Sequence, residues 1–537
     1  MQINYHHLLT VHNDNIAATT GRRPGFFIRT YGCQMNSRDS EKLAGLLAML
    51  GYQNAESLEA ADLAVFNTCC VRESAENRIF GHLSRLRHTK ENEKPGMLIA
   101  VGGCMSQQAE IAEKIAASHP YINIVFGTAN RHRLPEFLWR AIQSGKQVID
   151  ITDDENLPEL DAVPVTTRDY PHKAGVNIMY GCDNYCSYCI VPYVRGRERS
   201  RPAADILREI EALAADGVKE IMLLGQNVNS YGKGLPPAVA GEATKQSSKV
   251  PFAISDASKL DTTRHCEERS DEAIQQEESS LANVSGLLRS ARNDKLQVHQ
   301  QSDDESPTLS HAENISDFPA LLREVNKIPG LERIRFMTSH PKDFSDELIA
   351  AVRDLDKVCK TVHLPLQSGS TKVLEDMNRG YTQTEYLDLA SRLKEAGISL
   401  STDIIVGYPG ETDEDFEATL EAARQVRFTG AFTFIYSKRT GTPAARRTDI
   451  VPRKVAADRF EQLTATIYPI LLEINETKVG ETVSVMVEEI TGTAIKGRAD
   501  DNTLVHFEAG DDTCQPGQIV PVRITTAKSF YVCGEIV

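Results

Sequence analysis

Three cysteines lie close together in a pattern that suits a metal cluster. Cys182, Cys186 and Cys189 have the spacing C-x3-C-x2-C and directly follow the apolar run at residues 176–179. Thiolates this close converge on one point, so they bind metal more readily than they pair as disulfides. A structural zinc site needs a fourth ligand, and the next twenty residues contain no Cys or His. Because three cysteines leave one iron of a four-iron cluster open, we predict a cluster that binds a further group, with a zinc knuckle or a chance grouping as the alternative.

Three further cysteines each end a strand-like apolar run that a helix-like stretch follows. They are Cys33, Cys69 and Cys104, and the runs span residues 26–33, 61–69 and 97–104. Alternating strands and helices build a parallel sheet, and ligands bind at the carboxyl ends of its strands. We expect these thiols to meet in space and to hold a second cluster with an open iron, although a buried core thiol is the commoner fate of one cysteine. Cys70 adjoins Cys69, but neighbouring residues of an extended chain point to opposite sides, so we predict Cys69 as the ligand.

The elements that must position the first three cysteines form a second alternating pattern. Strands and helices in turn predict a parallel barrel or part-barrel, with its function at the loops that follow the strands. Those loops are rich in glycine and polar residues, which let the backbone approach a ligand closely; they span residues 225–227, 338–341, 367–370, 407–411 and 438–443. The predicted strands are at 176–179, 220–224, 333–336, 361–364, 402–406 and 431–436, and the predicted helices include 205–215, 347–355, 386–396 and 414–424.

The rest of the chain divides around these two α/β units. We expect a loose tail at 1–24, an N-terminal parallel α/β domain at 25–150, a linker at 151–172 and the barrel domain at 173–475. Within the barrel domain, residues 234–315 are rich in Ser and Gln, carry excess acid and have almost no aromatic residues, so we predict a disordered insertion without chemistry of its own. Residues 476–537 predict a small antiparallel β-barrel, with strands at 483–487, 503–507, 518–525 and 530–536.

Composition narrows the class of protein. The 537 residues suit roughly two to four domains, and the apolar fraction of 41% is enough for packed cores. No run reaches the ~20 apolar residues that span a bilayer, and the N-terminus lacks a secretory pattern, so we expect a soluble cytoplasmic protein without membrane contact. Eleven cysteines then favour metal or redox chemistry over disulfides. The net charge of −16 argues against coating nucleic acid by bulk electrostatics, and the acidic excess of residues 476–537 weakens a phosphate-binding argument there.

These motifs resemble the methylthiotransferase family of radical S-adenosylmethionine (SAM) enzymes over nearly the whole chain outside the tail and the insertion. The similar stretches are Thr30–Asn36, Asn67–Cys69, Gly103–Cys104 and Gly181–Cys189. The C-terminal barrel is similar to the TRAM domain, a tRNA-binding module. Residues 223–231, 338–341 and 434–437 are most similar to the branch that acts on N6-isopentenyladenosine in tRNA. The insertion and Cys70 depart from the family pattern.

The resemblance implies a reaction, its cofactors and its partners. Two 4Fe-4S clusters are expected: Cys182, Cys186 and Cys189 hold the one that reductively cleaves SAM, and Cys33, Cys69 and Cys104 hold the one that carries sulfur. A second SAM supplies the methyl group, and C2 of an isopentenylated adenosine 3′ of the anticodon becomes methylthiolated. The expected partners are a tRNA anticodon loop, whose bases are already unstacked, a flavodoxin- or ferredoxin-like electron donor, and a sulfur donor.

Less specific positions follow from the same resemblance. Cofactor contacts are expected from Gly225, Gln226, Gln367, Asp403 and Gly407. Contacts to RNA are expected from Arg195, Arg197, Arg523 and Lys528, with a merely solvated charged face as the alternative. Two alternative reactions use the same chemistry, on threonylcarbamoyl-adenosine in tRNA or on an aspartate of a ribosomal protein. A non-catalytic iron–sulfur RNA-binding protein is the alternative outside enzymes.

Overall fold

The computed structural model describes residues 3–70, 73–152, 168, 170–233, 315–508 and 514–537, and for 73–77 the backbone alone. The insertion predicted at 234–315, except Ile315, and most of the linker predicted at 151–172 lie outside these residues. No helix in the described part of the chain is both long and apolar enough to cross a membrane.

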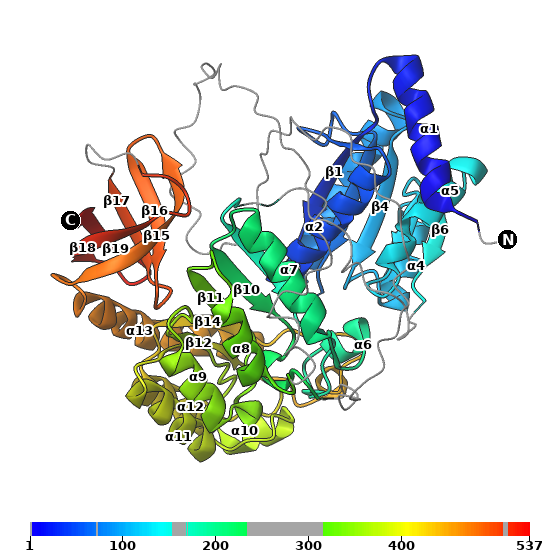
Figure 1. Cartoon of the computed structure of the whole chain (residues 1–537). Coiled ribbons are helices and arrows are strands. Elements are labelled where there is room, and N and C mark those ends of the chain that lie inside the picture. The colour runs from blue at the N-terminus through cyan, green and yellow to red at the C-terminus, as the bar shows by residue number, and fades with distance from the viewer. Residues whose placement is uncertain (1–2, 71–72, 153–167, 169, 234–314, 509–513) are drawn as a thin grey trace.

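A six-stranded parallel sheet forms the N-terminal domain, in the order β2-β1-β3-β4-β5-β6 (Figure 1). Every residue of β3 is buried, as expected for a parallel strand covered on both faces: Val65 packs in one apolar core, and Ala64 and Phe66 pack in another. The strands are β1 (Gly25–Thr30), β2 (Gln53–Asn54), β3 (Leu63–Thr68), β4 (Leu98–Gly103), β5 (Ile124–Phe126) and β6 (Val148–Asp150). The helices are α2 (Gln34–Met49), α3 (Glu73–His88), α4 (Ala109–Ser118) and α5 (Leu134–Ser144), with short helices η1 (Thr89–Glu93) and η2 (Arg131–Arg133).

The loose tail predicted at residues 1–24 is wrong, because most of it forms helix α1 (Tyr5–Thr20). Asn4 caps the start of α1 by accepting a hydrogen bond from the His7 N–H, and Gly21 ends it in the left-handed conformation. The helix packs on α5 (Figure 1). Leu9 is fully buried, and the Asn13 side chain donates to the Leu50 carbonyl at 2.8 Å. Tertiary contacts of this kind supply most of a helix's stability, and a mostly polar stretch gives little sign of them.

The central domain is a part-barrel of six parallel strands in two sheets. One sheet has the order β11-β10-β7 and the other β12-β13-β14, and a bridge between Ile334 and Val358 connects them. The strands are β7 (Lys173–Asn177), β10 (Glu220–Leu224), β11 (Arg333–Phe336), β12 (Thr361–His363), β13 (Ser399–Val406) and β14 (Gly430–Ile435). The helices are α7 (Ala203–Ala215), α8 (Phe318–Lys327), α9 (Asp346–Asp354), α10 (Thr371–Asp376), α11 (Gln383–Glu395) and α12 (Asp413–Val426), with η4 (Val228–Ser230), η6 (Pro341–Asp343) and η7 (Ala444–Arg446). Between β7 and α7 lie β8 (Met179–Tyr180), α6 (Val191–Arg195) and β9 (Arg199–Ser200).

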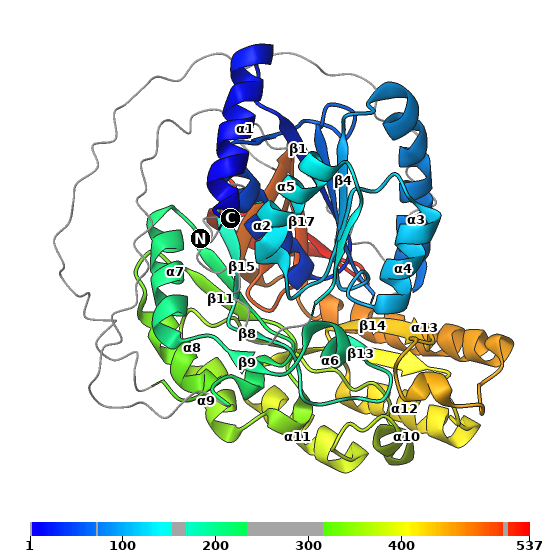
Figure 2. The same cartoon turned by 90° about the vertical axis from the view of Figure 1, so that its right-hand side faces the viewer.

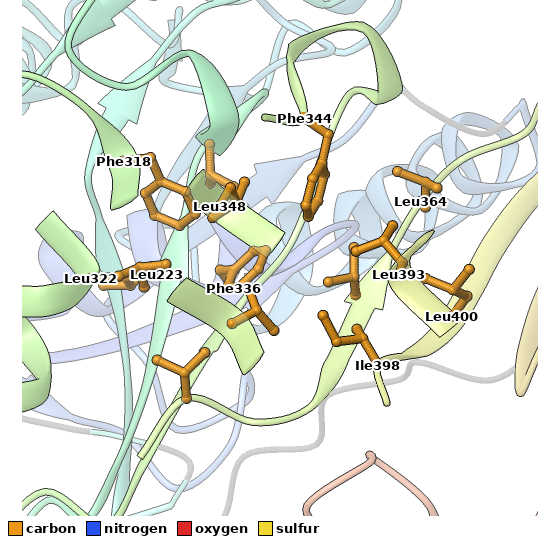
Figure 3. Close-up of a cluster of buried hydrophobic side chains, with 14 of the residues drawn as sticks. Leu223, Phe318, Leu322, Phe336, Phe344, Leu348, Leu364, Leu393, Ile398 and Leu400 are labelled. Atoms are coloured by element: carbon orange, nitrogen blue, oxygen red, sulfur yellow. The ribbon is translucent and has the colours of Figure 1, made fainter. Parts of the chain in front are cut away.

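An apolar core between strands and outer helices holds the part-barrel together (Figure 3). Phe318 of α8 meets Phe336 of β11 edge to face, with ring centroids 5.1 Å apart, and burial of each such ring contributes roughly 1.5–3 kcal/mol. Residues alternate along β13: Leu400, Ile404 and their like are buried, whereas the residues between them are partly exposed. The partly exposed face of β13 therefore lines the barrel interior and leaves room for a ligand.

A closed five-stranded barrel ends the chain, in the order β15-β16-β17-β19-β18. Helix α13 (Arg453–Glu476) leads into β15 (Thr482–Thr491), β16 (Ala494–Ala499), β17 (Leu504–Glu508), β18 (Ile519–Ala527) and β19 (Val532–Ile536). The sequence predicts four of these strands and misses β16, whose central Gly497 lowers strand propensity. A Cβ on Gly497 would lie 2.4 Å from the Met486 carbonyl oxygen, so the glycine is needed for close strand packing.

The C-terminal barrel docks on the amino-terminal ends of the part-barrel strands. Arg333 at the start of β11 donates to the carbonyl oxygens of Arg498 and Ser484, at 2.7 and 2.8 Å. Arg335 donates to the Ala499 carbonyl at 2.9 Å. The cysteine-bearing loop follows β8 beyond the carboxyl end of β7, so barrel and loop lie at opposite ends of the strands.

Candidate iron–sulfur sites

The cysteines of the N-terminal domain meet at one edge of its sheet, as predicted. Cys33, Cys69 and Cys104 directly follow or lie just beyond the carboxyl ends of the neighbouring strands β1, β3 and β4. The Cys104 N–H donates to the Thr68 carbonyl at 3.0 Å. A Cβ on Gly32 would lie 2.6 Å from the Cys69 sulfur, so the backbone before Cys33 contacts Cys69 as closely as a glycine permits. Register and turn chemistry together bring three thiols from distant parts of the sequence to one place.

Cys70 also faces this site, which the sequence argument did not anticipate. Strand β3 ends at Thr68, so the alternation of an extended chain does not continue to Cys70. Its thiol hydrogen-bonds Cys104 and, despite burial, lowers the pKa of Cys104 to about 6, with the Arg195 charge acting in the same direction. Cys33, in contrast, is exposed. Both Cys69 and Cys70 are buried.

Arg195 belongs to the N-terminal cysteine site and does not face solvent. Its Nε donates to the Cys104 sulfur at 3.2 Å, and its Nη2 donates to Asn36 Oδ1 at 2.7 Å and Asp39 Oδ2 at 2.8 Å. Only 4% of the side chain is exposed. The prediction that Arg195 contacts RNA is therefore wrong: a carboxylate 156 positions away in sequence pairs with it, which spacing alone does not reveal.

The other three cysteines occupy one loop between β8 and α6. The Cys189 N–H donates to the Cys186 carbonyl at 2.9 Å, and the Asn184 side chain lies 3.5 Å from the Cys182 sulfur. The segment after α10 holds this loop from outside: the Asn378 side chain donates to the carbonyls of Asn184 and Tyr185, both at 3.1 Å. Burial raises the pKa of Cys182 to about 11 and that of Cys189 to about 12.

Arg379 is a residue of this site that the sequence argument missed. It is buried, and its Nη1 donates to the Cys186 sulfur and to the Tyr188 hydroxyl, both at 3.4 Å. Its Nε donates to the Tyr381 hydroxyl at 3.0 Å. In the sequence it stands between Asn378 and Gly380, and an arginine in a polar turn of this kind gives no sign of burial.

The positions predicted to contact a cofactor lie around the carboxyl ends of the strands. Gly225 follows β10 and packs against Met179. Gln367 has a positive φ of 63° and its N–H donates to the Asp403 carbonyl at 2.8 Å. Asp403 lies on the partly exposed face of β13, with His363 Nε2 at 3.3 Å. Gly407 follows β13 and its N–H donates to Glu411 at 3.0 Å.

Near these strand ends, Gln226 and His340 each have a buried polar atom without a hydrogen-bond partner among the described residues. Gln226 donates through Nε2 to the Met35 sulfur at 2.8 Å, across the domain boundary, while its Oε1 has no partner. His340 accepts at Nδ1 from the Lys342 N–H, and its Nε2 has no partner. Burial lowers the pKa of His340 to about 2, so the ring is neutral. A bound ligand can satisfy both atoms.

The remaining residues predicted to contact RNA are exposed. The Arg197 side chain is 63% exposed and pairs with Asp183 at 3.2 Å. Arg523 on β18 lies 3.9 Å from Glu535 and is also exposed. Lys528 lies in the turn between β18 and β19, exposed to solvent.

The donor chemistry at both cysteine sites suits an iron–sulfur cluster. Among the described residues, no three His, Cys, Asp or Glu side chains stand close enough to hold one metal ion. A four-iron cluster has a different requirement, because each thiolate binds its own iron at a separate corner. The N-terminal site offers the thiols of Cys33, Cys69 and Cys104, with Cys70 beside them, and the loop site offers three thiols. Each site also has one buried arginine that donates to a sulfur, Arg195 in one and Arg379 in the other.

Comparisons with known proteins match each domain. The radical SAM superfamily model matches residues 176–255 and 264–423, the TRAM domain model matches 476–537, and the model described as uncharacterized protein family UPF0004 matches 25–127. The tRNA-2-methylthio-N(6)-dimethylallyladenosine synthase of Acetivibrio thermocellus is 44% identical over 524 residues, or 96% of this chain and 92% of that one. The synthase of the same name from Caldicellulosiruptor saccharolyticus is 42% identical over 96% of this chain and 93% of that one. The solved structure of the radical SAM methyltransferase TsrM from Kitasatospora setae is 14% identical with a TM-score of 0.46, covering 86% of this chain and 80% of that one.

The part-barrel with its three-cysteine loop is thus a radical SAM domain. With relatives this similar over nearly their whole length, the chain belongs to the tRNA-2-methylthio-N(6)-dimethylallyladenosine synthase family.

Proposed function

We propose that this chain methylthiolates C2 of N6-isopentenyladenosine next to the anticodon of tRNA, giving 2-methylthio-N6-isopentenyladenosine. The proposal rests on the family to which the chain belongs and on one observation in the structure. Arg195 stands six positions after Cys189 and contacts Cys104, so the two cysteine sites meet at one interface. A reaction that needs a radical and a sulfur group at the same carbon requires this arrangement.

We assign one 4Fe-4S cluster to each site. Cys182, Cys186 and Cys189 hold the cluster whose open iron binds SAM, and Cys33, Cys69 and Cys104 hold the second. When bound, the clusters and SAM supply the electron, the radical and the sulfur and methyl groups that an unactivated C2–H bond requires. The chain contributes donors to the ligand sulfurs, and hydrogen bonds of this kind tune a cluster.

The interior of the part-barrel orients the cofactor. We assign cofactor contacts to Gly225, Gln226, Gln367, Asp403 and Gly407 because they lie on or just after neighbouring strands. The free carbonyl oxygen of Gln226 is supporting evidence, since a buried acceptor without a partner costs about 1–3 kcal/mol. Neutral His340 offers an Nε2–H donor to an oxygen of a ligand.

An exposed aromatic pair suits a splayed RNA base. Tyr185 lies in the cysteine loop and Tyr193 on α6 just after it; they are 40% and 44% exposed, with ring centroids 5.9 Å apart. Single-stranded bases stack on exposed aromatic rings, at roughly 1–3 kcal/mol per base. Arg197 beside them, and Arg523 and Lys528 on the C-terminal barrel, supply phosphate contacts in this proposal.

The proposal also needs an electron donor of the flavodoxin or ferredoxin type and a donor of sulfur. We place the reaction in the cytoplasm, where tRNA is modified. In support, no disulfide joins the cysteines in the described part of the chain, which suits a reducing compartment.

Nucleoside mass analysis tests the substrate. Anaerobically reconstituted protein receives SAM, a reductant and one of three substrates: isopentenylated tRNA, threonylcarbamoylated tRNA or ribosomal protein. We expect deoxyadenosine and the methylthio product with isopentenylated tRNA alone. A product on threonylcarbamoyl-adenosine or on a ribosomal-protein aspartate assigns the alternative reaction, and no deoxyadenosine with any substrate assigns a non-catalytic iron–sulfur protein.

Substitution tests the stacking pair. Replacing Tyr185 or Tyr193 with Ala should weaken tRNA binding roughly tenfold, in line with one lost stacking contact, while deoxyadenosine formation without tRNA continues. Unchanged tRNA affinity in both variants would remove the pair from the binding surface.

A further inference from the structure

Arg195 is a buried cation that neither cofactor binding nor RNA binding explains. A guanidinium stays charged at any physiological pH, and a buried charge is costly unless its partners compensate it. Its three contacts are Cys104, Asn36 and Asp39. Each of them belongs to the N-terminal domain, although Arg195 itself belongs to the radical SAM domain.

Asp39 pairs with two arginines. It accepts from Arg195 at 2.8 Å and also pairs with Arg131. All three side chains are almost fully buried. The Arg195 cation also lies against the Cys104 sulfur. This cation stabilises an anionic sulfur at Cys104 and the negatively charged thiolate cluster of which that sulfur would be part.

Asn36 fixes the direction of the contact. Its Nδ2 donates to the carbonyls of Tyr31 and Thr68, at 2.8 and 2.9 Å. Its Oδ1 must then point the other way, where it accepts from Arg195 and lies 3.7 Å from the Cys104 sulfur. The guanidinium is therefore aimed at the sulfur by two side chains that are themselves fixed.

Helix α6, which carries Arg195, lies between the N-terminal sheet and the rest of the radical SAM domain (Figure 2) and packs on the N-terminal core. Ile190 and Val194 are buried in the same apolar core as Cys104 and Cys70. The Thr128 hydroxyl donates to the Val194 carbonyl. The short helix that follows Cys189 thus packs directly against the N-terminal cysteine site.

We infer that Arg195 is a positioning residue that fixes the N-terminal cluster against the radical SAM loop and raises the reduction potential of that cluster. The inference rests on the proposed function, because it requires a second cluster at Cys33, Cys69 and Cys104. Net charge and hydrogen bonds to ligand sulfurs set a cluster's potential. A cation and an N–H donor at the Cys104 sulfur favour the reduced cluster, which carries one more negative charge.

Redox titration of the reconstituted full-length protein, followed by electron paramagnetic resonance, tests this role. Addition of SAM changes the signal of the cluster at Cys182, Cys186 and Cys189 and so distinguishes the two clusters. Arg195→Met should lower the potential of the N-terminal cluster, and Arg195→Lys, which keeps the charge but loses the fork of donors, should lower it less. Asp39→Asn removes the opposing charge and should raise it.

Arg197→Met is the matched control, because it removes the same charge from the same loop at an exposed position. It should leave the potential of the N-terminal cluster unchanged. Opposite shifts for Arg195→Met and Asp39→Asn support the inference, since general damage to the site has no reason to change sign with charge. If Arg195→Met does not retain the cluster, Arg195→Lys and Asp39→Asn decide by the same criterion.

Two results overturn the inference and are distinguishable from each other. An unmodified protein that holds a single cluster overturns it together with the two-cluster part of the proposed function. The second result is a protein with two clusters and normal methylthiolation in which substitution of Arg195 and of Asp39 leaves the potential of the N-terminal cluster unchanged, or shifts it in the same direction. That result overturns this inference alone.

Discussion

The two cysteine sites are chemically alike but are built in opposite ways. Cys182, Cys186 and Cys189 come from one loop, which contacts after α10 hold in place. Cys33, Cys69 and Cys104 follow three different strands, and the arginine that contacts Cys104 comes from another domain. Burial raises the pKa of Cys182 and Cys189 to about 11 and 12, whereas hydrogen bonding from Cys70 and the charge of Arg195 lower the pKa of Cys104 to about 6.

This difference shows what each site depends on. A loop can present three thiols as soon as its own domain folds. The site at the sheet edge is complete only when the radical SAM domain docks and brings α6 into the N-terminal core. We therefore expect a change in the N-terminal domain to leave the loop site intact. A change in the radical SAM domain should more readily disturb the site at the sheet edge.

The largest expected effect separates the two sites by function. Cys182→Ala should abolish deoxyadenosine formation, because the cluster that binds SAM loses a ligand. Cys33→Ala should retain SAM cleavage and lose methylthiolation of tRNA. Deoxyadenosine and methylthio-nucleoside, measured on the same reaction, check both variants, and full methylthiolation by Cys33→Ala would refute the division of roles.

The next effect decides between two adjacent thiols. We expect Cys69→Ala to lose the N-terminal cluster and Cys70→Ala to retain it, because Cys69 is the assigned ligand and Cys70 only hydrogen-bonds Cys104. Iron and sulfide analysis after anaerobic reconstitution measures the outcome. The reverse pattern would make the ligand Cys70, which hydrogen-bonds Cys104, in place of Cys69, which packs against Gly32.

A smaller effect concerns the arginine of the loop site. Arg379→Met removes the donor to Cys186 and should weaken retention of the SAM-binding cluster roughly 10- to 100-fold, the usual effect of losing an outer-shell partner. The N-terminal cluster should keep its signal. Iron release to a chelator under anaerobic conditions is the measurement, with Arg353→Met, an exposed arginine on α9, as the control.

The smallest effect is a pH dependence of stability that arises at the loop site. His340 beside Arg379 has its pKa lowered to about 2 by burial, so the folded protein keeps it neutral while the unfolded chain protonates it below about pH 6.5. Stability from this residue is complete above pH 6.5 and falls as the pH drops, by up to about 1.4 kcal/mol per pH unit. Denaturant unfolding at pH 7 and pH 5 should show a smaller loss for His340→Gln than for the unmodified protein, and equal losses would contradict the assignment.

Sequence patterns were sufficient where local chemistry repeats along the chain. The order of strand, cysteine and helix predicted that Cys33, Cys69 and Cys104 share a sheet edge, because topology alone determines that placement. The six strands of the part-barrel follow for the same reason, since alternation and glycine-rich loops mark each one.

The same patterns failed where a long-range partner decides. Arg195 stands in a run of arginines that is typical of a solvated face, and only Asp39 and Cys104 reveal its burial. Arg379 gives little local signal, because the sulfur that it contacts lies on a loop almost two hundred residues earlier. Cys70 was misjudged because the strand ends at Thr68, and strand ends depend on hydrogen bonding to neighbours.

The attachment of the C-terminal barrel through Arg333 and Arg335 has a consequence for substrate length. A strand of five residues spans about 16 Å, and at least that distance separates the barrel from the cysteine loop at the far ends of the strands. A ligand that contacts both the C-terminal barrel and the cysteine loop must therefore be long enough to bridge this distance.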